Sequence, residues 1–450
     1  MPVKTLPPKI SQREAFWFWL KLGFISFGGP AGQIAIMHQE LVEHRRWISE
    51  RRFLHALNYC MLLPGTEAQQ LATYLGWLMH RTSGGLIAGG LFVLPSLLIL
   101  IALSWVYVAF GHLTWIMSLF YGIKPAVAAI VLHAAFRIGS RALKNSWLWM
   151  IAACAFIAIT ILDAPFPLIV LSAAFIGGMG GRFAPRIFAL GGGHAPSSRN
   201  KKQAQAFEPA VIDDDTPTPE HARLNIQHVV MTGFLGIVIW LASLFLIALL
   251  FGWRSPLTLM AWFFTKAALL TFGGAYAVLP YVYQGAVTDF SWLTAAQMMD
   301  GLALGETTPG PLIMVVTFVG FLSGVSQHIM GTDSVFLSGV IAALVVTWFT
   351  FLPSFVFIFM GGPVIEATHN DIQLTAPLTA ITAAVVGVIL NLALFFGYHV
   401  LWPQGLNGRF DGISASIAAL AAIALFKLNS KVMHVIFACA SAGLLLTLCH

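Results

Sequence analysis

Long, unbroken apolar runs restrict the fold of this chain more than any other feature. Residues 85–110 and 232–251 contain no charged side chain, and a helix needs about 20 apolar residues to cross the hydrocarbon core of a bilayer. Only 9% of the 450 residues are charged, whereas an ordinary soluble domain is about a quarter charged. The runs also lack the alternating polarity of outer-membrane barrel strands. The sequence therefore predicts an all-α polytopic membrane protein embedded in a lipid bilayer.

Positive charge is concentrated in the first half of the chain. Residues 1–223 carry 19 Lys and Arg against 11 Asp and Glu, while residues 224–450 carry five against seven. The basic residues form short clusters, which include Lys4/Lys9/Arg13, Arg45/Arg46/Arg51/Arg52 and Arg137/Arg141/Lys144. Such clusters are typical of cytoplasmic loops, so the formal net charge of +6 does not indicate a nucleic-acid partner. We expect a cytoplasmic N-terminus.

One polar segment divides the chain. Residues 191–223 include Ser-Ser-Arg-Asn-Lys-Lys and three consecutive aspartates followed by Thr-Pro-Thr-Pro. Such a composition cannot bury enough apolar surface to fold. The sequence thus predicts an N-terminal membrane unit (residues 1–190), a flexible cytoplasmic linker (residues 191–223) and a C-terminal membrane unit (residues 224–450).

The two units contain an internal repeat. At a constant offset of 245 residues, ten of the 45 positions from Lys21 to Gly65 are identical to those from Lys266 to Gly310. Chance similarity between apolar segments does not place Phe-Gly-Gly, a tryptophan and Pro-Gly in register. Five apolar passes are expected between the copies, at 85–110, 113–136, 146–162, 166–181 and 226–251. Because five is odd, the second copy should be inverted relative to the first.

Helix interruptions are expected at the repeated motifs. These are Phe27-Gly28-Gly29-Pro30 and Pro64-Gly65-Thr66 in the first copy, and Phe272-Gly273-Gly274 and Pro309-Gly310-Pro311 in the second. Re-entrant or broken helices give nine full passes with four hairpins, and continuous helices give 13 passes. We favour the former, because a full crossing by residues 14–43 would place the basic residues 45–52 outside. Inverted repeats with paired Gly/Pro interruptions are typical of secondary transporters, which bind substrate near the midplane.

The interrupted helices supply a predicted anion site. A helix that starts inside the membrane exposes N–H groups and a partial positive charge, which together bind anions. The predicted substrate-binding residues at these starts are Gly28, Gly29, Pro30, Pro64, Gly65, Thr66, Gly273, Gly274, Thr307, Thr308, Pro309, Gly310 and Pro311. The alternative is that Gly and Pro merely allow kinks or close helix packing, as is common in membrane helices.

Charged residues in the apolar segments are further candidates. Lys21 and Lys266 each lie six residues before a Phe-Gly-Gly motif, where they could offer two positive charges to a divalent oxyanion or snorkel toward the interface. Glu67 and Glu306 could exchange protons or pair with these lysines. Weaker candidates for lining the same cavity are Gln69, Gln70 and Asp300, whereas Lys124, His133 and Arg137 are expected at the membrane interface.

No motif indicates an enzyme. The chain contains no GxxxxGK[ST], HExxH or GxSxG sequence, so nucleotide-driven pumping and hydrolysis have no support. Its four cysteines form neither a CxxC pair nor a His-containing metal spacing. The sequence therefore predicts no catalytic residue, cofactor or metal.

The motifs resemble those of the chromate ion transporter family in its long two-domain form. The resemblance is carried by the paired Phe-Gly-Gly motifs, by residues 67–74 (EAQQLATY) and 92–96 (FVLPS), and by Pro309-Gly310-Pro311. One departure is Thr66, where the first half of the family usually reads Pro-Gly-Pro, and a threonine cap could replace the proline.

The resemblance implies a secondary active transporter in the cytoplasmic (inner) membrane of a bacterium. It would export chromate, confer chromate resistance, and be driven by protons or by exchange with another counter-ion. Sulfate, also a tetrahedral dianion, is an alternative substrate. A non-transporting membrane protein with a signalling or structural role is a second alternative, and a homo-oligomer is left open.

Overall fold

In the computed structural model, the residues described are 10–27, 29–183, 210–214, 216–272, 274–367, 375–405 and 408–448. They form a helical protein in which six helices are long and apolar enough to cross a membrane. These are α4 (Glu67–Phe110), α5 (Thr114–Ala142), α7 (Phe166–Phe183), α10 (Ile226–Phe251), α15 (Val335–Ala367) and α16 (Thr375–Leu401). The prediction of an all-α polytopic membrane protein is confirmed.

Short helices flank both Phe-Gly-Gly motifs. In the first copy α1 (Gln12–Ile25) is followed by α2 (Gly29–His38) and by one π-helical turn, η1 (Gln39–His44). In the second, α11 (Pro256–Leu269) is followed by α12 (Ala275–Tyr283) and by the π-helical turn η3 (Gln284–Asp289). At 1.5 Å per residue the 14 residues of α1 extend about 21 Å, which is less than the ~30 Å hydrocarbon core. Gly28 and Gly273 lie outside the described residues.

The Pro-Gly motifs also separate short helices. They lie between α3 (Glu50–Cys60) and α4, and between α13 (Ala295–Thr307) and the 3-10 turn η4 (Leu312–Met314), which leads into α14 (Val315–Ser326). Ser49 caps α3 and Thr294 caps α13, each with its side-chain oxygen on a backbone N–H three residues on. These two caps lie at matching positions of the repeat and start both helices at the same place.

The 44-residue helix α4 is two antiparallel helices. The backbone leaves helical geometry at His80 and Arg81, and the chain then turns back on itself. A Cβ atom at Gly76 would lie 2.5 Å from Ala88 Cβ, so residues 67–79 run beside residues 82–110. In the second copy α14 packs against α15 in the same way, with the hydroxyls of Thr317 and Thr347 2.9 Å apart. The pass expected at 85–110 is therefore the outer arm of this hairpin.

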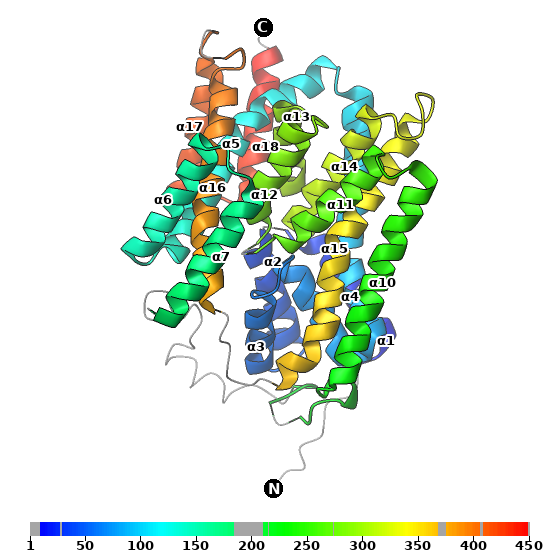
Figure 1. Cartoon of the computed structure of the whole chain (residues 1–450). Coiled ribbons are helices and arrows are strands. Elements are labelled where there is room, and N and C mark those ends of the chain that lie inside the picture. The colour runs from blue at the N-terminus through cyan, green and yellow to red at the C-terminus, as the bar shows by residue number, and fades with distance from the viewer. Residues whose placement is uncertain are drawn as a thin grey trace.

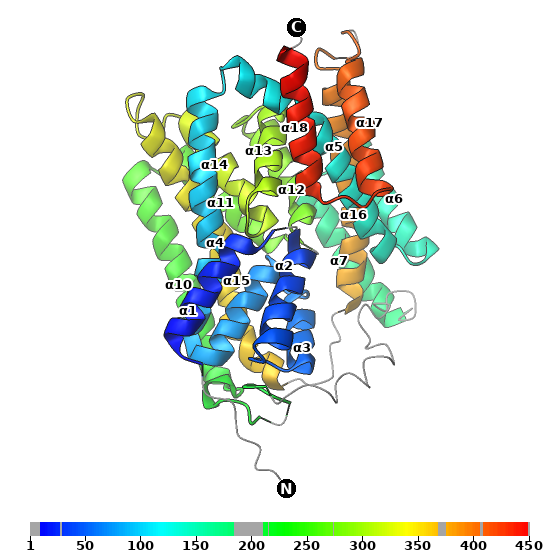
Figure 2. The same ribbon diagram turned by 180° about the vertical axis from the view of Figure 1, so that it is seen from behind.

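The two sets of short helices occupy opposite ends of the molecule. Helices α1, α2 and α3 lie in the half that contains the N-terminus, while α11, α12, α13 and α14 lie in the other half (Figures 1 and 2). Helix α15 extends from one half into the other. The remaining helices α6 (Ser146–Ile161), α17 (Gly412–Phe426) and α18 (Val432–Leu448) form a lateral bundle with α5, α7 and α16.

Part of the segment expected to be a flexible linker is packed against the N-terminal unit. Residues 191–209 and 215 lie outside the described residues. Further on, the N–H groups of Val211 and Ile212 donate to the carbonyl oxygens of Arg46 and Trp47 at 2.9 and 3.0 Å. Ile212 and Ala222 are buried. The segment is polar on average, so its composition does not reveal these apolar side chains. Their burial explains why residues 210–223 pack against the N-terminal unit, although a flexible linker was expected.

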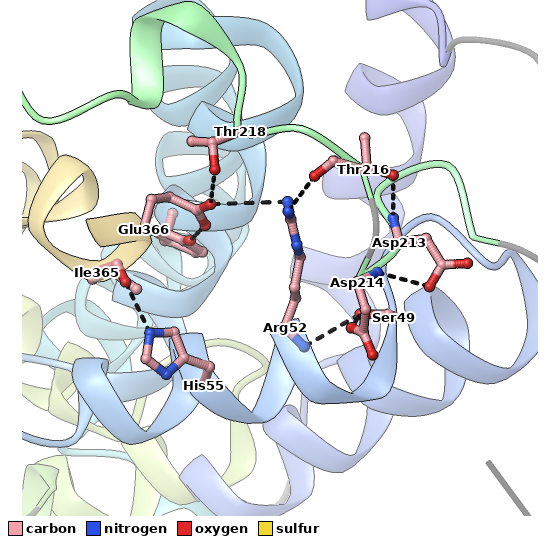
Figure 3. A network of polar contacts seen from close by, with 10 residues as sticks. Ser49, Arg52, His55, Asp213, Asp214, Thr216, Thr218, Ile365 and Glu366 are labelled. Atoms are coloured by element: carbon pink, nitrogen blue, oxygen red, sulfur yellow. Dashed lines mark hydrogen bonds and ion pairs between the residues drawn. The ribbon is translucent and has the colours of Figure 1, made fainter. Parts of the chain in front are cut away.

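A buried ion pair joins this segment to both units (Figure 3). Arg52 of α3 lies 3.8 Å from Glu366 near the end of α15 and donates to the carbonyl oxygen of Thr216 at 2.5 Å. Glu366 also accepts hydrogen bonds from the hydroxyls of Tyr74 and Thr218. Because these five residues come from α3, α4, α15 and the polar segment, the network fixes their relative positions.

Candidate functional site

The helix interruptions of one unit contact those of the other. The N–H of Gly65 donates to the carbonyl oxygen of Thr271, and the N–H of Gly310 donates to the carbonyl oxygen of Ser26, both at 2.8 Å. The two bonds are equivalent under the 245-residue offset of the repeat. They bring both Pro-Gly motifs and both Phe-Gly-Gly segments to one crossing between the two sets of short helices.

The crossing depends on glycine at its two donor positions. Gly65 and Gly310 have φ angles of +127° and +97°, which side-chain-bearing residues rarely adopt. A Cβ atom would also meet neighbours, at 2.6 Å from Gln70 Nε2 for Gly65 and at 2.8 Å from Ser96 Cβ for Gly310. The hydroxyl of Ser354 would lie even nearer to a Cβ atom at Gly65. Ser354 corresponds to Ser96, because the Leu-Pro-Ser sequences at 94–96 and 352–354 match at an offset of 258 residues. This geometry agrees with the alternative interpretation of the motifs, in which Gly and Pro allow close packing, and substrate binding by these glycines stays a prediction.

Buried polar side chains surround the crossing without full sets of hydrogen bonds. Gln33 donates to the carbonyl oxygen of Gly310, and Gln70 donates to that of Pro64 at 2.8 Å. The Oε1 atoms of both glutamines and the hydroxyls of Ser26 and Ser96 are buried without a hydrogen-bond partner. Unpaired buried polar groups are costly, so such a cluster marks a place where a polar ligand would be bound.

Sequence reasoning missed three members of this cluster. Ser26, Gln33 and Ser96 sit in apolar stretches next to the repeated motifs. Their polarity in such stretches was the available signal, whereas the uncharged candidates outside the motifs, Gln69 and Gln70, were taken only from the segment after Pro64-Gly65.

The helix starts differ in detail from expectation. Pro30 lies in the first turn of α2 as predicted, and a Cβ atom at Gly29 would lie 3.1 Å from the Leu312 side chain at the start of η4. Two of the starts are therefore adjacent. Gly274 occupies the N-cap position of α12. The chain after Pro311 first forms the 3-10 turn rather than an α-helix, and 3-10 turns are frequent at helix N-termini.

The threonines do not cap the following helices. Thr66 is at the N-cap position of α4, but its hydroxyl bonds to Gln69 Oε1 at 3.4 Å and not to a backbone N–H. The hydroxyls of Thr307 and Thr308 donate to the carbonyl oxygens of Leu304 and Gly305 within their own helix. The cap expected at Thr66 is therefore absent, because its hydroxyl donates to the Gln69 side chain. That Thr307 and Thr308 supply hydroxyls to an anion stays a prediction.

The two glutamates lie close to the motifs but do not pair with the lysines. Glu67 is the first residue of α4, directly after the Pro64-Gly65-Thr66 motif. Glu306, in the last turn of α13, accepts a hydrogen bond from the hydroxyl of Tyr276 in α12. Arg137, expected at the interface, is half-buried on α5, a helix that packs against α13.

No described contact brings the two lysines to the crossing. Lys21 is exposed and lines an open cavity of about 440 Å³ with Arg13, Glu14 and Arg45. Lys266 is half-buried, with its Nζ 6.0 Å from the centre of the Trp262 ring, a cation–π distance. The structure thus places both cations beside aromatic or mixed-charge surfaces rather than beside Gly65 and Gly310.

A third acid, Asp300, is better enclosed than the sequence suggested. Its side chain is 3% exposed, and Oδ2 accepts a hydrogen bond of 2.9 Å from the Tyr107 hydroxyl and lies 3.6 Å from Lys124 Nζ. Lys124 was expected at the membrane interface. It pairs with this carboxylate instead, because α5, which carries Lys124, packs against α13.

Together these features define a polytopic helical membrane protein in which four helix interruptions meet at a buried polar crossing. Comparison with known proteins narrows the class. The family model described as chromate transporter matches residues 13–178 and 258–444, one stretch in each unit. The chain belongs to the chromate transporter family.

Curated relatives match over most of their length. The chain is 32% identical to a chromate transport protein of Pseudomonas aeruginosa over 98% of this chain and 94% of that protein. It is 29% identical to a chromate transport protein of Cupriavidus metallidurans (86% of this chain, 83% of the relative) and to a probable chromate transport protein of Synechococcus elongatus (94% and 92%). No solved structure matches the chain.

Proposed function

We propose that this protein is a secondary active transporter that exports chromate from the cytoplasm and thereby confers chromate resistance. The observation that carries the proposal is the pair of equivalent hydrogen bonds, Gly65 to Thr271 and Gly310 to Ser26. They join helix interruptions of both units at one buried place, as expected for a central transport site. Family membership and the names of the curated relatives support chromate as the substrate.

The crossing has the chemistry that a tetrahedral dianion requires. The hydroxyls of Ser26 and Ser96 are buried and lack partners, so they can donate to oxyanion oxygens without first breaking a bond. The starts of α2 and η4 lie beside them and present backbone N–H groups with a partial positive charge. Glu67 and Glu306 lie at neighbouring helix ends, where in their ionised form they would favour release of the anion over tight retention.

The repeat suggests how the site changes sides. We propose that the second copy is inverted, that the chain divides at residues 190 and 223 as the sequence indicates, and that the two units rock about the crossing. The basic clusters and the N-terminus would face the cytoplasm, with the protein in the bacterial inner membrane. Protons or a counter-ion would supply the driving force, and sulfate would compete for the site.

Transport by purified protein in proteoliposomes tests the proposal. Labelled chromate uptake should be inhibited by unlabelled sulfate. In Ser26→Ala or Ser96→Ala the loss of a hydrogen bond to a charged ligand, about 1.5–3 kcal/mol, should raise the KM for chromate by about tenfold to 150-fold. Ser441→Ala, which alters an exposed serine of α18, is the matched control. Absence of chromate flux in folded wild-type protein would overturn the proposal, and unchanged KM values in both site variants would remove the crossing from the pathway.

A further inference from the structure

Asp300, Tyr107 and Lys124 form a second buried polar group inside the helical bundle. They come from α13, α4 and α5. All three are tied through one atom, because the Tyr107 hydroxyl and Lys124 Nζ both approach Oδ2 of Asp300, at 2.9 and 3.6 Å. The other oxygen, Oδ1, is buried and has no hydrogen-bond partner. Burying a carboxylate in the membrane with one oxygen lacking a hydrogen bond costs free energy of folding.

Asp300 is much more deeply buried than its cationic partner. Its side chain is 3% exposed while that of Lys124 is 30% exposed, so the ion pair connects a buried anion to a more accessible cation. Tyr107 is itself wedged between the rings of Phe120 and Phe318. Lys124 and Tyr107 are the charged and titratable groups that act on Asp300 from the helices packed against α13 within the described residues.

Asp300 is mechanically linked to the crossing. It lies on α13, seven residues before the end of that helix at Thr307 and ten before Gly310. At 1.5 Å per residue Thr307 is about 10 Å from Asp300 along the helix. Breaking the bonds of Asp300 to α4 and α5 would therefore free the same helix that presents the Pro-Gly motif of the C-terminal unit.

We propose that Oδ1 of Asp300 is the binding site of the proton that is exchanged for chromate. The inference rests on the proposed transport function and replaces Glu67 and Glu306 as the coupling group. When a proton enters, an O–H bond forms at Oδ1 and the carboxylate becomes a neutral acid. Lys124 then loses its counter-charge and the attraction between α5 and α13 falls. Helix α13, with the Pro-Gly motif that follows it, can then move relative to α4. The proton leaves on the opposite side and the ion pair reforms.

The neutral isostere isolates this role. In Asp300→Asn the site resembles the protonated state permanently. Downhill chromate exchange between the two sides should persist within about threefold of wild type, whereas stimulation of chromate uptake by an acidic vesicle interior should disappear. Asp289→Asn alters an exposed acid of the same unit, just before the loop that precedes α13, and should keep full stimulation by the pH gradient.

Tyr107→Phe is a second test variant. Its readout is the pH dependence of uptake, which a purely structural role of Tyr107 would leave unchanged. It preserves the ring contacts but removes the donor to Oδ2, so the charged carboxylate is less stabilised. The pH at which gradient-driven uptake is half-maximal should move upward by about one unit or more, as expected for loss of a hydrogen bond to a charged group. Downhill exchange of chromate between the two sides, measured at saturating chromate, should remain in this variant.

The outcomes separate this inference from the proposed function. Gradient stimulation in Asp300→Asn equal to that of wild type would overturn the assignment of Asp300. If Asp300→Asn does not insert or fold, an unmoved pH midpoint in Tyr107→Phe would overturn it instead. If wild-type chromate flux does not depend on the pH gradient, the inference is overturned and the proposed function stays intact. Absence of any wild-type flux would overturn both.

Discussion

Replacing Gly310 by alanine tests whether the crossing is required for transport. Gly310 has a φ of +97°, and Gly252, at the C-terminal end of α10, has the same φ of +97°. A Cβ atom at Gly252 would meet nothing within 4 Å, whereas one at Gly310 would lie 2.8 Å from Ser96 Cβ. The two substitutions thus impose the same backbone strain and differ in the steric contact. Gly252→Ala is the matched control.

The expected magnitudes follow from these contacts. Strain at such a φ costs about 1–3 kcal/mol in either variant. In Gly310→Ala the overpacking against Ser96 adds about 1–3 kcal/mol, and displacement of the N–H from the Ser26 carbonyl oxygen adds about 1 kcal/mol. We expect the thermal unfolding temperature in detergent to fall clearly further for Gly310→Ala than for Gly252→Ala. Chromate transport per folded molecule should be lost only in Gly310→Ala.

A second substitution makes the reasoning refutable. In the Gly310→Ala/Ser96→Gly variant the nearest remaining neighbour of the new Cβ is the Phe92 carbonyl oxygen at 3.5 Å, an ordinary contact. The unfolding temperature should therefore recover most of the difference from Gly252→Ala. Equal unfolding temperatures and equal transport in the two single variants would show that the backbone at Gly310 is not confined as the structure indicates.

Two further predictions concern polar contacts away from the crossing. Arg52→Met or Glu366→Met alone should lower the free energy of unfolding by about 3–5 kcal/mol, because each leaves a buried charge unpaired, while the double variant should lose much less; additive losses in thermal unfolding would contradict this. Burial alone would raise the pKa of Asp411, but hydrogen bonds from Ser414 and Tyr121 outweigh it and lower the pKa. Its contribution to stability is therefore present above the unfolded pKa of about 4 and is lost as the pH falls through the lower folded value. Unfolding temperatures of wild type and Asp411→Asn should differ at neutral pH and converge in acid, and a constant difference would refute the assignment.

The sequence predicted the fold class and the helix interruptions because both depend on local properties. Apolar run length determines which segments can cross a bilayer, and Gly and Pro determine where a helix stops. The passes expected at 113–136, 166–181 and 226–251 correspond to the candidate spanning helices α5, α7 and α10, and residues 146–162 form the shorter apolar helix α6. The reversal at His80 and Arg81 was not predicted, although Gly84 and Gly85 follow it closely, because glycines in membrane helices also serve close helix packing.

The partners of individual side chains were less predictable because they depend on tertiary contacts. Lys124 was assigned to the interface from its position in the chain, but the fold places Asp300, 176 residues later, beside it. Similarly, Thr66 is a good capping residue by type, yet Gln69 competes for its hydroxyl. A local rule gives the options for such a side chain, and packing chooses among them.

The two units match in their backbone at the crossing but differ in their ionisable groups. Both hydrogen bonds at Gly65 and Gly310 recur, and so do the neighbouring serines Ser96 and Ser354. Asp300 and Glu306, by contrast, correspond at the 245-residue offset to His55 and Met61. A site that must present the same face to both sides of the membrane benefits from duplication, whereas a group that binds one coupling ion per cycle needs a single copy. The repeat is therefore retained where substrate would bind and has diverged where we place the proton.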